Sequence, residues 1–591
     1  MKISIIGKAI RLAAIGATLL GFASCVTIDN TLGENFIPTE QIWDVYPCED
    51  VTLNEITMEY SDKLSGYSNK RFTFGSTRDE NFVSNSTASF TLVPVIDSLD
   101  FGTEANGYPK ISKFHLSAVR DTLSMVFDRQ ERMLQNVYVY GLKSPLDSNV
   151  LYTGTDLNAL TDNEIITKGI PVYDGGDSLS FDFSLEYTKS VIKGIQEFQK
   201  LDAEKRDSIN NYLKYVPGIV IGTDTQTEVG GRINMFDLPI VTESGYITGN
   251  YALLEFTGLY ENEPVDTSFV FYFGPADFLK DEDTEYPTQY AFNANENIPV
   301  NEGFMDTWEA GNKDNLYVSG GSGLKPVVRA SEIKSIVNSL IEQEVAEGNS
   351  LNKEEVVINK ATIILPYNVG TDYDKLNKYP LILNPTVRLV SDDGKYYTYA
   401  GLTDSSIESE NQGNINRSLN VYSPDVSHHV QQILNLTQGV GEDVPENETD
   451  EEFAKRLSKY DIWMLILHEE ITVTDNSSAY NDYYNNLLYN SYYNNMMYDP
   501  YGYGYGYGGY GYGGYGYGSY GGYGGYDSYG YSNYYNYYMM AAYASASSSS
   551  TSTSSSVELD IDRFYSGILN GPGAAEKPRL KITFSAPKER K

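Results

Sequence analysis

The sequence is poor in the residues on which covalent cross-links and much enzyme chemistry depend. Its 591 residues include only two cysteines, four histidines and three tryptophans. Two cysteines cannot build a disulfide framework. Basic residues are also outnumbered, since 43 Lys and Arg stand against 80 Asp and Glu and leave a net charge of −37. Binding to nucleic acid requires clustered positive charge, so this balance argues against a nucleic-acid partner.

Long apolar runs are also missing after the N-terminus, where no stretch reaches the ~18 residues of a membrane-spanning helix. The first 24 residues have the pattern of a secretory signal peptide, with three basic residues followed by an apolar segment at 12–22. The segment ends in Phe-Ala-Ser-Cys, which resembles the lipobox of bacterial lipoproteins. This resemblance implies cleavage after residue 24 and a lipid on Cys25. The alternative is ordinary cleavage beside a chance cysteine.

The predicted localisation is the bacterial outer membrane, with the lipid as the anchor. Surface lipoproteins of Bacteroidota usually carry an acidic run directly after the cysteine, but residues 26–30 offer only Asp29. The surface-exposed and periplasmic faces therefore both stay open. Residues 25–54 are polar, contain two prolines and lack periodicity, which predicts a lipidated tether. Cys48 within it is expected to be a small buried residue.

The rest of the chain contains one pattern twice. Residues 178–222 and 418–467 each begin with a strand-like run that ends in a serine, Ser184 or Ser423. An amphipathic segment follows, with a valine, Val191 or Val430, seven residues after that serine. A tyrosine, Tyr215 or Tyr460, later opens a short apolar strand. Such internal similarity predicts two copies of one β-rich domain.

Alternating Val, Tyr and Phe residues dominate both copies and predict strands that bury one face. Two facing sheets bury such faces best. The predicted fold is mainly β, with two tandem jelly-roll-like β-sandwich units and a few short helices. Unit one is predicted at 55–275, an acidic linker at 276–312, and unit two at 313–587. One helix is predicted from the apolar stripe of Val191, Ile192, Ile195 and Phe198. Two more are predicted at 203–215 and 331–347, the last capped by Ser331. A capping box formed by Thr449 and Glu452 starts a further short helix, and residues 385–400 are predicted to form a hairpin.

Unit two carries a predicted insertion at 474–556. Ten residues separate Gly222 from Arg232 in unit one (232 − 222), whereas 96 separate Leu467 from Arg563 in unit two (563 − 467). The extra residues are rich in Tyr and Gly, hold 25 of the 52 tyrosines, and end in a serine run. Such tracts are usually disordered and self-associating. The tract is either a drifting low-complexity loop or an adhesive segment that uses tyrosine stacking and hydrogen bonds.

The sequence contains no pattern from which we predict a catalytic, cofactor or metal site. Neighbouring residues of a helix point apart, so His428 and His429 are poorly placed to chelate one ion. Asp560 and Asp562 lie on one side of a predicted strand and are candidates for Ca²⁺, against the alternative of a solvated acidic face. Trp463 lies in an apolar strand, which leaves Trp43 and Trp308 as candidates for stacking on sugars.

Several motifs together resemble a family of Bacteroidota lipoproteins called domain of unknown function 4270. They are the lipobox, Val-Tyr-Val-Tyr-Gly-Leu at 137–142, the segments 418–434 and 460–467, and the closing segment 563–584. The family implies no assigned activity. Each half is also similar to DNRLRE-type, carbohydrate-binding-module-like jelly rolls, although residues 427–431 replace their Asp-Val-Thr segment.

These expectations favour a non-enzymatic cell-envelope lipoprotein that acts as a binding or scaffold module at the outer membrane. Its expected partners are the membrane, through the lipid, and envelope glycan or an outer-membrane protein complex. One alternative is a surface adhesin that works through the Tyr/Gly-rich loop. Another is a polysaccharide-degrading enzyme on a carbohydrate-binding-like fold.

Overall fold

The computed structural model describes part of the chain. The described residues are 43–47, 50–64, 66–68, 71–94, 101, 107–121, 125–126, 133–146, 153–206, 209–238, 241–243, 246–260, 263–274, 291–367, 369, 376, 378–391, 394, 397–406, 411–441, 444–474, 552–560 and 565–588. The predicted signal peptide, Cys25, Cys48, Asp562 and the Tyr/Gly-rich tract at 475–551 lie outside these ranges. Among the helices described, none has both the length and the hydropathy to cross a bilayer.

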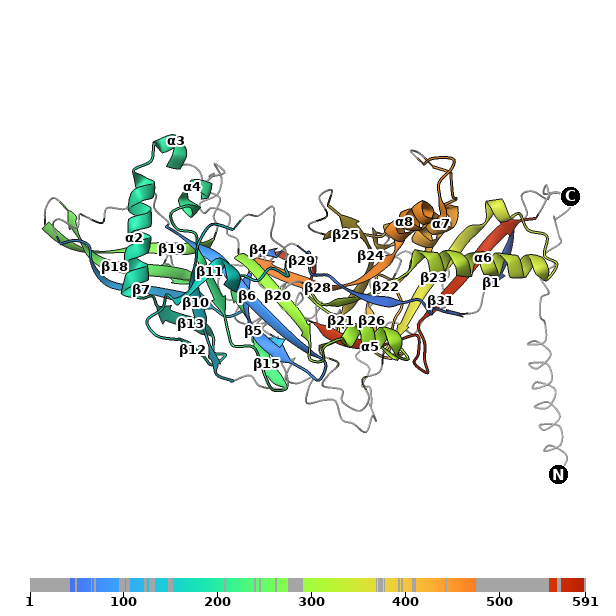
Figure 1. Ribbon diagram of the computed structural model, residues 1–591, viewed down its shortest axis with the longest axis horizontal. Coiled ribbons are helices and arrows are strands. Elements are labelled where there is room, and N and C mark those ends of the chain that lie inside the picture. Colours follow the sequence, from blue (N-terminus) through green and yellow to red (C-terminus); the bar gives the residue numbers. More distant parts are fainter. Residues whose placement is uncertain are drawn as a thin grey trace, which may run out of the picture.

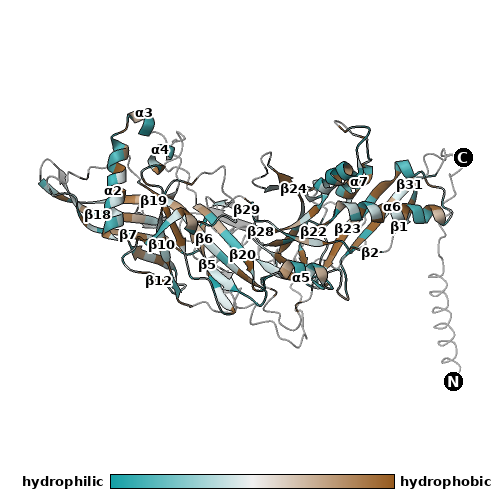
Figure 2. Cartoon of the chain, in the orientation of Figure 1, coloured by the Kyte–Doolittle hydropathy of each residue, from teal (hydrophilic) through white to brown (hydrophobic). Residues whose placement is uncertain are grey.

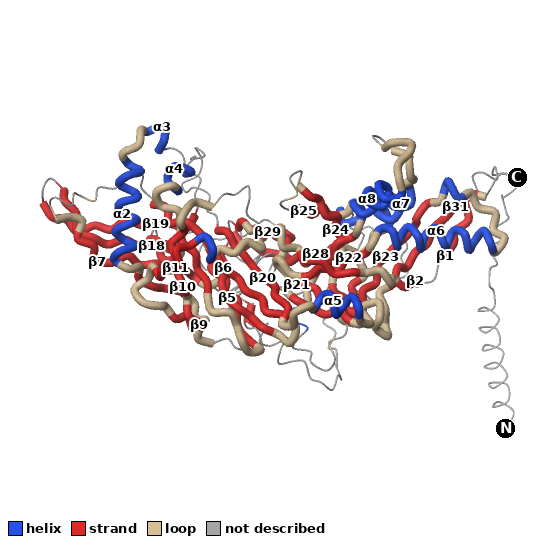
Figure 3. The backbone as a smooth tube through the Cα atoms, in the orientation of Figure 1, coloured by secondary structure: helices blue, strands red, loops and turns tan. Residues whose placement is uncertain are grey.

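The fold is mainly β, as predicted from the sequence. Strands form an elongated body, and helices lie at its periphery (Figure 3). The body has two β-sandwich units arranged along its long axis (Figure 1). Unit one contains residues 67–299, and unit two combines residues 43–60 with residues 304–588.

The elements of unit one are three α-helices, the 3₁₀ helix η4 (Asn158–Leu160) and seventeen strands within the described ranges. They are β4 (Tyr67–Ser68), β5 (Arg71–Arg78), β6 (Phe82–Pro94), β7 (Lys110–Val119), β8 (Met125–Val126), β9 (Gln135–Asn136), β10 (Tyr138–Leu142), β11 (Thr161–Ile165), β12 (Val172–Tyr173), β13 (Ser178–Asp182), α2 (Leu185–Gln199), α3 (Ala203–Arg206), α4 (Ile209–Leu213), β14 (Ile219–Gly222), β15 (Gly230–Asp237), β16 (Val241–Glu243), β17 (Tyr246–Gly249), β18 (Tyr251–Tyr260), β19 (Glu263–Gly274) and β20 (Ala291–Pro299).

The described elements of unit two come from both ends of the chain. They are β1 (Trp43–Pro47), β2 (Val51–Thr52), β3 (Thr57–Tyr60), α5 (Phe304–Ala310), β21 (Asn315–Ser319), β22 (Leu324–Val328), α6 (Ala330–Ala346), β23 (Val357–Pro366), β24 (Ile382–Val390), β25 (Tyr397–Gly401), the 3₁₀ turn η7 (Thr403–Ser406), β26 (Ile415–Asn416), β27 (Val421–Tyr422), α7 (Ser427–Asn435), α8 (Asp450–Leu457), β28 (Ile462–Thr474), β29 (Ser552–Leu559), β30 (Ser566–Asn570) and β31 (Arg579–Pro587).

Unit one is a sandwich whose two halves share the long strand β6. One half has the strand order β13-β7-β18-β19-β6, and the other has β11-β10-β14-β6 with β20, β5 and β15 beside it. Alternate residues of both halves meet in one core rich in phenylalanine, in which Phe72 packs on Phe90, Phe236 and Phe273. The strands carry hydrophobic residues, and helix α2 alternates between hydrophilic and hydrophobic turns (Figure 2).

Unit two has two main sheets with the orders β1-β31-β23-β27-β26 and β25-β24-β28-β22-β3. Its core combines residues of both sheets with the buried faces of α6 and α7. On α6 these are Ile333, Val337 and Ile341, spaced four residues apart, so they line one side of the helix.

The two units repeat one topology. The orders β11-β10-β14-β6 and β13-β7-β18 in unit one correspond to β25-β24-β28-β22 and β27-β23-β31 in unit two. Helices α2 and α7 each follow the matching strand, and both bury the predicted valine, Val191 or Val430. The internal similarity in the sequence therefore reflects a repeated order of paired strands.

The strand that completes each repeat comes from a different place in the chain. In unit one, β19 follows β18 in a hairpin, pairs along β18, and pairs at its end with β6. In unit two, residues 43–60 fill the equivalent position. Strands β1 and β2 pair with β31, and β3 pairs with β22. Unit two is thus circularly permuted relative to unit one, and unit one is inserted between its parts.

This arrangement differs from the predicted boundaries. The tether expected at 25–54 is already a strand from Trp43, and residues 57–60 belong to unit two. The linker expected at 276–312 contains β20, which pairs with β6 of unit one, and α5, whose Phe304 packs on Phe82 and Tyr317. The strands β1, β2 and β3 are only two to five residues long, too short to show an alternating pattern in the sequence.

Several local predictions are confirmed. Val191, Ile192, Ile195 and Phe198 form the buried stripe of α2, and a capping box joins Thr449 and Glu452 at the start of α8. Within the helix expected at 203–215, the structure describes α3 at Ala203–Arg206 and α4 at Ile209–Leu213.

The cap predicted for α6 is wrong. Ser331 lies inside the helix and makes no cap. The first backbone N–H group, of Ala330, donates to Asp461 Oδ1 at 2.9 Å. A carboxylate more than a hundred residues away in the chain thus replaces the local cap that the sequence offered.

Candidate functional site

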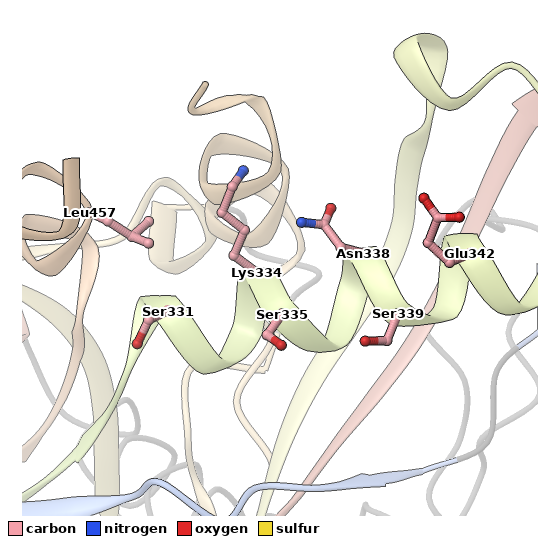
Figure 4. Close-up of a pocket in the computed structure, with 7 residues that line it drawn as sticks. All are labelled: Ser331, Lys334, Ser335, Asn338, Ser339, Glu342 and Leu457. Atoms are coloured by element: carbon pink, nitrogen blue, oxygen red, sulfur yellow. The ribbon is translucent and has the colours of Figure 1, made fainter. Parts of the chain in front are cut away.

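A shallow groove of about 640 Å³ runs along the outward side of α6 (Figure 4). Its residues recur at helical spacing on the side opposite the core stripe, and Leu457 at the end of α8 forms part of the other wall. The lining from α6 is polar and consists of Ser331, Lys334, Ser335, Asn338, Ser339 and Glu342.

The charged groups of this groove are engaged with other parts of the protein. Lys334 Nζ donates to the carbonyl oxygens of Ile433 and Leu434 at 3.1 and 3.0 Å. Burial lowers the pKa of Lys334, and the positive charge of Arg456 lowers it further. Glu342 forms an ion pair with Lys353 at 2.7 Å. The groove therefore offers hydroxyl and amide groups for hydrogen bonds, while its carboxylate and its amine are both occupied.

A second polar assembly covers the outer face of the sheet that contains β28. Glu59 of β3 accepts from Arg329 at 2.8 Å and from Arg388 at 3.2 Å, and Arg329 also donates to Asp461 at 2.8 Å. The Arg388 guanidinium lies 4.1 Å from the centre of the Trp463 ring. These contacts tie the N-terminal strand to unit two.

Of the three tryptophans, Trp308 differs in exposure from the prediction. Trp463 is buried, as expected, but it lies beneath Arg388 on the outer face of the sheet. Trp308 was expected to be accessible, yet it is buried, and its Nε1 donates to the carbonyl of Asn315 at 2.6 Å. Trp43 alone is exposed.

The histidines do not converge on one site. His115 Nδ1 lies 2.7 Å from Asp182 Oδ1, with Lys113 Nζ at 3.4 Å from the same oxygen. Burial raises the pKa of Asp182, but the hydrogen bond to His115 and the charge on Lys113 outweigh it and leave the pKa lowered. His428 is exposed and His429 is buried, so their rings point apart.

The buried His429 has a structural partner. Its Nε2 lies 2.8 Å from the carbonyl oxygen of Tyr460. Burial lowers the pKa of His429, and this hydrogen bond opposes the effect.

Lys325 is a buried cation that sequence reasoning missed. Its ammonium donates to the carbonyl oxygens of Ser319, Gly321 and Gly323 and to Ser61 Oγ. Burial lowers its pKa to about 7, against the opposing charge of Asp560. The preceding Ser-Gly-Gly-Ser-Gly segment is the only sequence signal, because it provides a tight turn with inward carbonyls.

Asp560 lies beside the turn that surrounds Lys325, where its carbonyl oxygen accepts from the backbone N–H group of Gly321 at 2.8 Å. It is buried rather than part of a solvated face, and its Oδ2 accepts from the backbone N–H group of Tyr565 at 2.9 Å. Within the described ranges, no group of three His, Cys, Asp or Glu side chains is placed to hold a metal ion.

The Tyr/Gly-rich tract begins and ends on a β-ladder. β28 and β29 pair from Leu467 with Leu559 to Thr474 with Ser552. Part of the serine run is therefore strand, and of the insertion predicted at 474–556 the structure describes residues 474 and 552–556.

No family model, curated protein or solved structure matches this chain. The resemblance to the domain of unknown function 4270 lipoproteins and to DNRLRE-type jelly rolls therefore stays a prediction that rests on the sequence motifs.

Proposed function

We propose that this chain is a non-enzymatic lipoprotein of the bacterial outer membrane, anchored through Cys25, whose two sandwiches act as a binding or scaffold module. Its proposed partners are an outer-membrane protein complex or envelope glycan. The groove on α6 is the candidate contact for glycan, because hydroxyl and amide groups suit a polar, uncharged ligand.

One observation carries the proposal. The first described strand after Cys25 is β1, which pairs with β31 at one end of the long axis, while unit one occupies the other end (Figure 1). An anchor at Cys25 would therefore hold unit two next to the bilayer and present unit one away from it. Such an arrangement suits a spacer that displays binding surfaces.

The anchor is tested by expressing the chain with Cys25 and with Cys25→Ala in the same envelope. We expect the wild type in the detergent-soluble membrane fraction, with an acylated N-terminal peptide by mass spectrometry. The variant should enter the soluble fraction. A wild-type N-terminus that carries no lipid would refute the anchor.

The binding role is tested by cross-linking and affinity capture from envelope membranes. The intact protein is compared with a variant in which residues 476–550 are replaced by a short Gly-Ser turn, which keeps the β28–β29 ladder. Partners that survive the replacement would be held by the sandwiches.

The hairpin of β28 and β29 at the base of the Tyr/Gly-rich tract supports a second candidate function, a surface adhesin. A ladder of paired strands closes the tract, so the tract leaves the fold from a fixed base. Loss of all captured partners in the shortened variant would favour the adhesin over the scaffold.

A further inference from the structure

An apolar patch lies on the outer face of the sheet that contains β1. Trp43, Val45 and Val357 are 45%, 58% and 44% exposed. They lie on neighbouring strands, because Val45 pairs with Ser585 of β31 and Ser585 pairs with Val357 of β23. We call these three residues the β1 patch.

The exposed side chains on the equivalent face of unit one are polar, and the apolar Leu253 and Val270 on that face are half-buried. β19, β18 and β7 occupy the positions of β1, β31 and β23, and their outward side chains include Asp266, Thr257, Glu255 and Lys113. Thr257 donates to Asp266 at 2.7 Å. One topology therefore carries a solvated face in one unit and an exposed apolar face in the other, so the fold itself does not require the β1 patch.

Basic side chains flank the β1 patch, although the chain as a whole is strongly acidic. Lys581 and Lys360 are exposed on the same face, and Asp425, which pairs with Lys360 at 2.5 Å, is buried. Arg579 joins them and pairs with Asp50 at 3.2 Å. Aromatic and aliphatic side chains flanked by basic groups suit the headgroup region of an anionic bilayer.

The residues between Cys25 and Trp43 connect the proposed lipid anchor directly to this patch. Trp43 follows Cys25 by eighteen positions (43 − 25), which span at most about 60 Å when fully extended. A lipid on Cys25 would therefore keep the β1 patch within reach of the bilayer.

We propose that the β1 patch rests on the lipid bilayer that carries the anchor, with Trp43 at the headgroup level and Lys581 and Lys360 facing anionic headgroups. This inference deepens the proposed function and rests on it for the anchor. The proposed contact also fixes how the molecule is oriented on the membrane. The outer face of the β1 sheet lies against the bilayer, and the equivalent face of unit one does not.

The test uses the mature chain from residue 25 with Cys25→Ser, so that no lipid contributes. Vesicles contain phosphatidylcholine alone or with one quarter phosphatidylglycerol. Trp308 and Trp463 are buried, so Trp43 dominates changes in tryptophan emission. We expect a blue shift and quenching by brominated acyl chains with the anionic vesicles, and a weaker response at high salt.

Variants identify the surface. W43S/V45S should lower vesicle co-sedimentation about tenfold or more. K581E should weaken binding to the anionic vesicles alone. The control is V265S on β19, where Val265 is 42% exposed but lies on the opposite face of its sheet from Asp266, and it should leave binding unchanged.

The outcomes separate this inference from the anchor. Equal partitioning of wild type and W43S/V45S, without an emission shift, overturns the bilayer contact even if Cys25 is acylated in cells. Concentration-dependent dimers that W43S/V45S abolishes would overturn it in favour of a second copy of the chain. Specific vesicle binding by a protein that is not acylated in cells would support the contact and refute the anchor.

Discussion

Unit one and unit two share a strand order but differ in where the completing strand originates. In unit one, β19 follows its partner β18 directly in the chain and pairs along it, and only the end of β19 pairs with the distant strand β6. In unit two, the same position is filled by residues 43–60, whose partner β31 ends at Pro587. One unit closes on itself, and the other is closed by the start of the chain.

The N-terminal segment is held by more than its backbone ladders. Leu53, Ile56 and Met58 are buried in the core of unit two. Glu332 of α6 accepts from the backbone N–H groups of Asn54 and Glu55 at 2.5 and 3.0 Å. The comparison shows that two units of one chain can have a strand at the same place in the sheet although that strand comes from different parts of the sequence.

The strongest test removes and restores the completing strand. A chain that starts at residue 61 should lose the unfolding transition of unit two, because burial of three large side chains contributes more than about 5 kcal/mol, close to the whole stability of a domain. Attaching residues 43–60 after Lys588 through a two- to four-residue turn should restore the transition. Calorimetry measures both, with the transition of unit one as the internal reference. If the truncated chain keeps both transitions, the closure by residues 43–60 is dispensable.

The buried cations of the units should respond differently to pH. Lys325 has a lowered pKa of about 7. The unfolded chain keeps that proton up to about pH 10, so it binds more protons above pH 7 and the stability of unit two should rise with pH, by at most about 1.4 kcal/mol per pH unit. The fully buried Arg232 of unit one stays charged, so it adds no such slope.

Denaturant melts between pH 7 and pH 9 measure this difference. Lys325→Met leaves the surrounding carbonyl oxygens without their donor, so it should lower stability and remove the slope. Parallel pH profiles for the wild type and the variant would show that Lys325 does not titrate in this range.

A smaller effect is expected at the ion pairs that fasten β3. Glu59→Gln weakens the contacts with Arg329 and Arg388, whose side chains are partly exposed, so the loss in unit two should be about 1–2 kcal/mol. The exposed Glu255 on β18 provides the matched control, and Glu255→Gln should change the stability of unit one by less than about 0.5 kcal/mol. Equal losses of stability in the two variants would show that the ion pairs of Glu59 contribute nothing beyond those of an exposed surface carboxylate.

The smallest effects compare local and remote helix caps. Ser184 caps α2 of unit one by accepting from the backbone N–H group of Tyr187, so Ser184→Ala should cost about 1 kcal/mol. Ser331→Ala in α6 should be neutral, because Asp461 accepts from Ala330 instead. Thermal melts of the two variants decide this, and a cost at Ser331 equal to that at Ser184 would contradict the assignment of Asp461 as the cap.

The sequence revealed features that depend on local periodicity. The stripe of α2, the capping box of α8 and the hairpin of β24 and β25 are all encoded within about fifteen residues. The repeat was visible because the two helices and the following apolar strands retain similar spacing around Val191 and Val430.

Features that depend on distant partners were not visible. β1, β2 and β3 have two to five residues each, too few to show alternation, and they become strands because β31 and β22 need edge partners. Asp461 and Lys325 act through groups far away in the sequence or within an irregular turn. Trp308 looked accessible because its neighbours are acidic and polar, yet its ring fills the gap beside β21.

The placement of β1 beside β31 also has a consequence in time. The ribosome makes Trp43 early, but the partner strand begins only at Arg579, 532 residues after Pro47 (579 − 47). At about 5–20 residues per second, roughly half a minute to two minutes of synthesis separate the two strands. Unit one can be finished during that wait, whereas the first strands made are among the last to be seated.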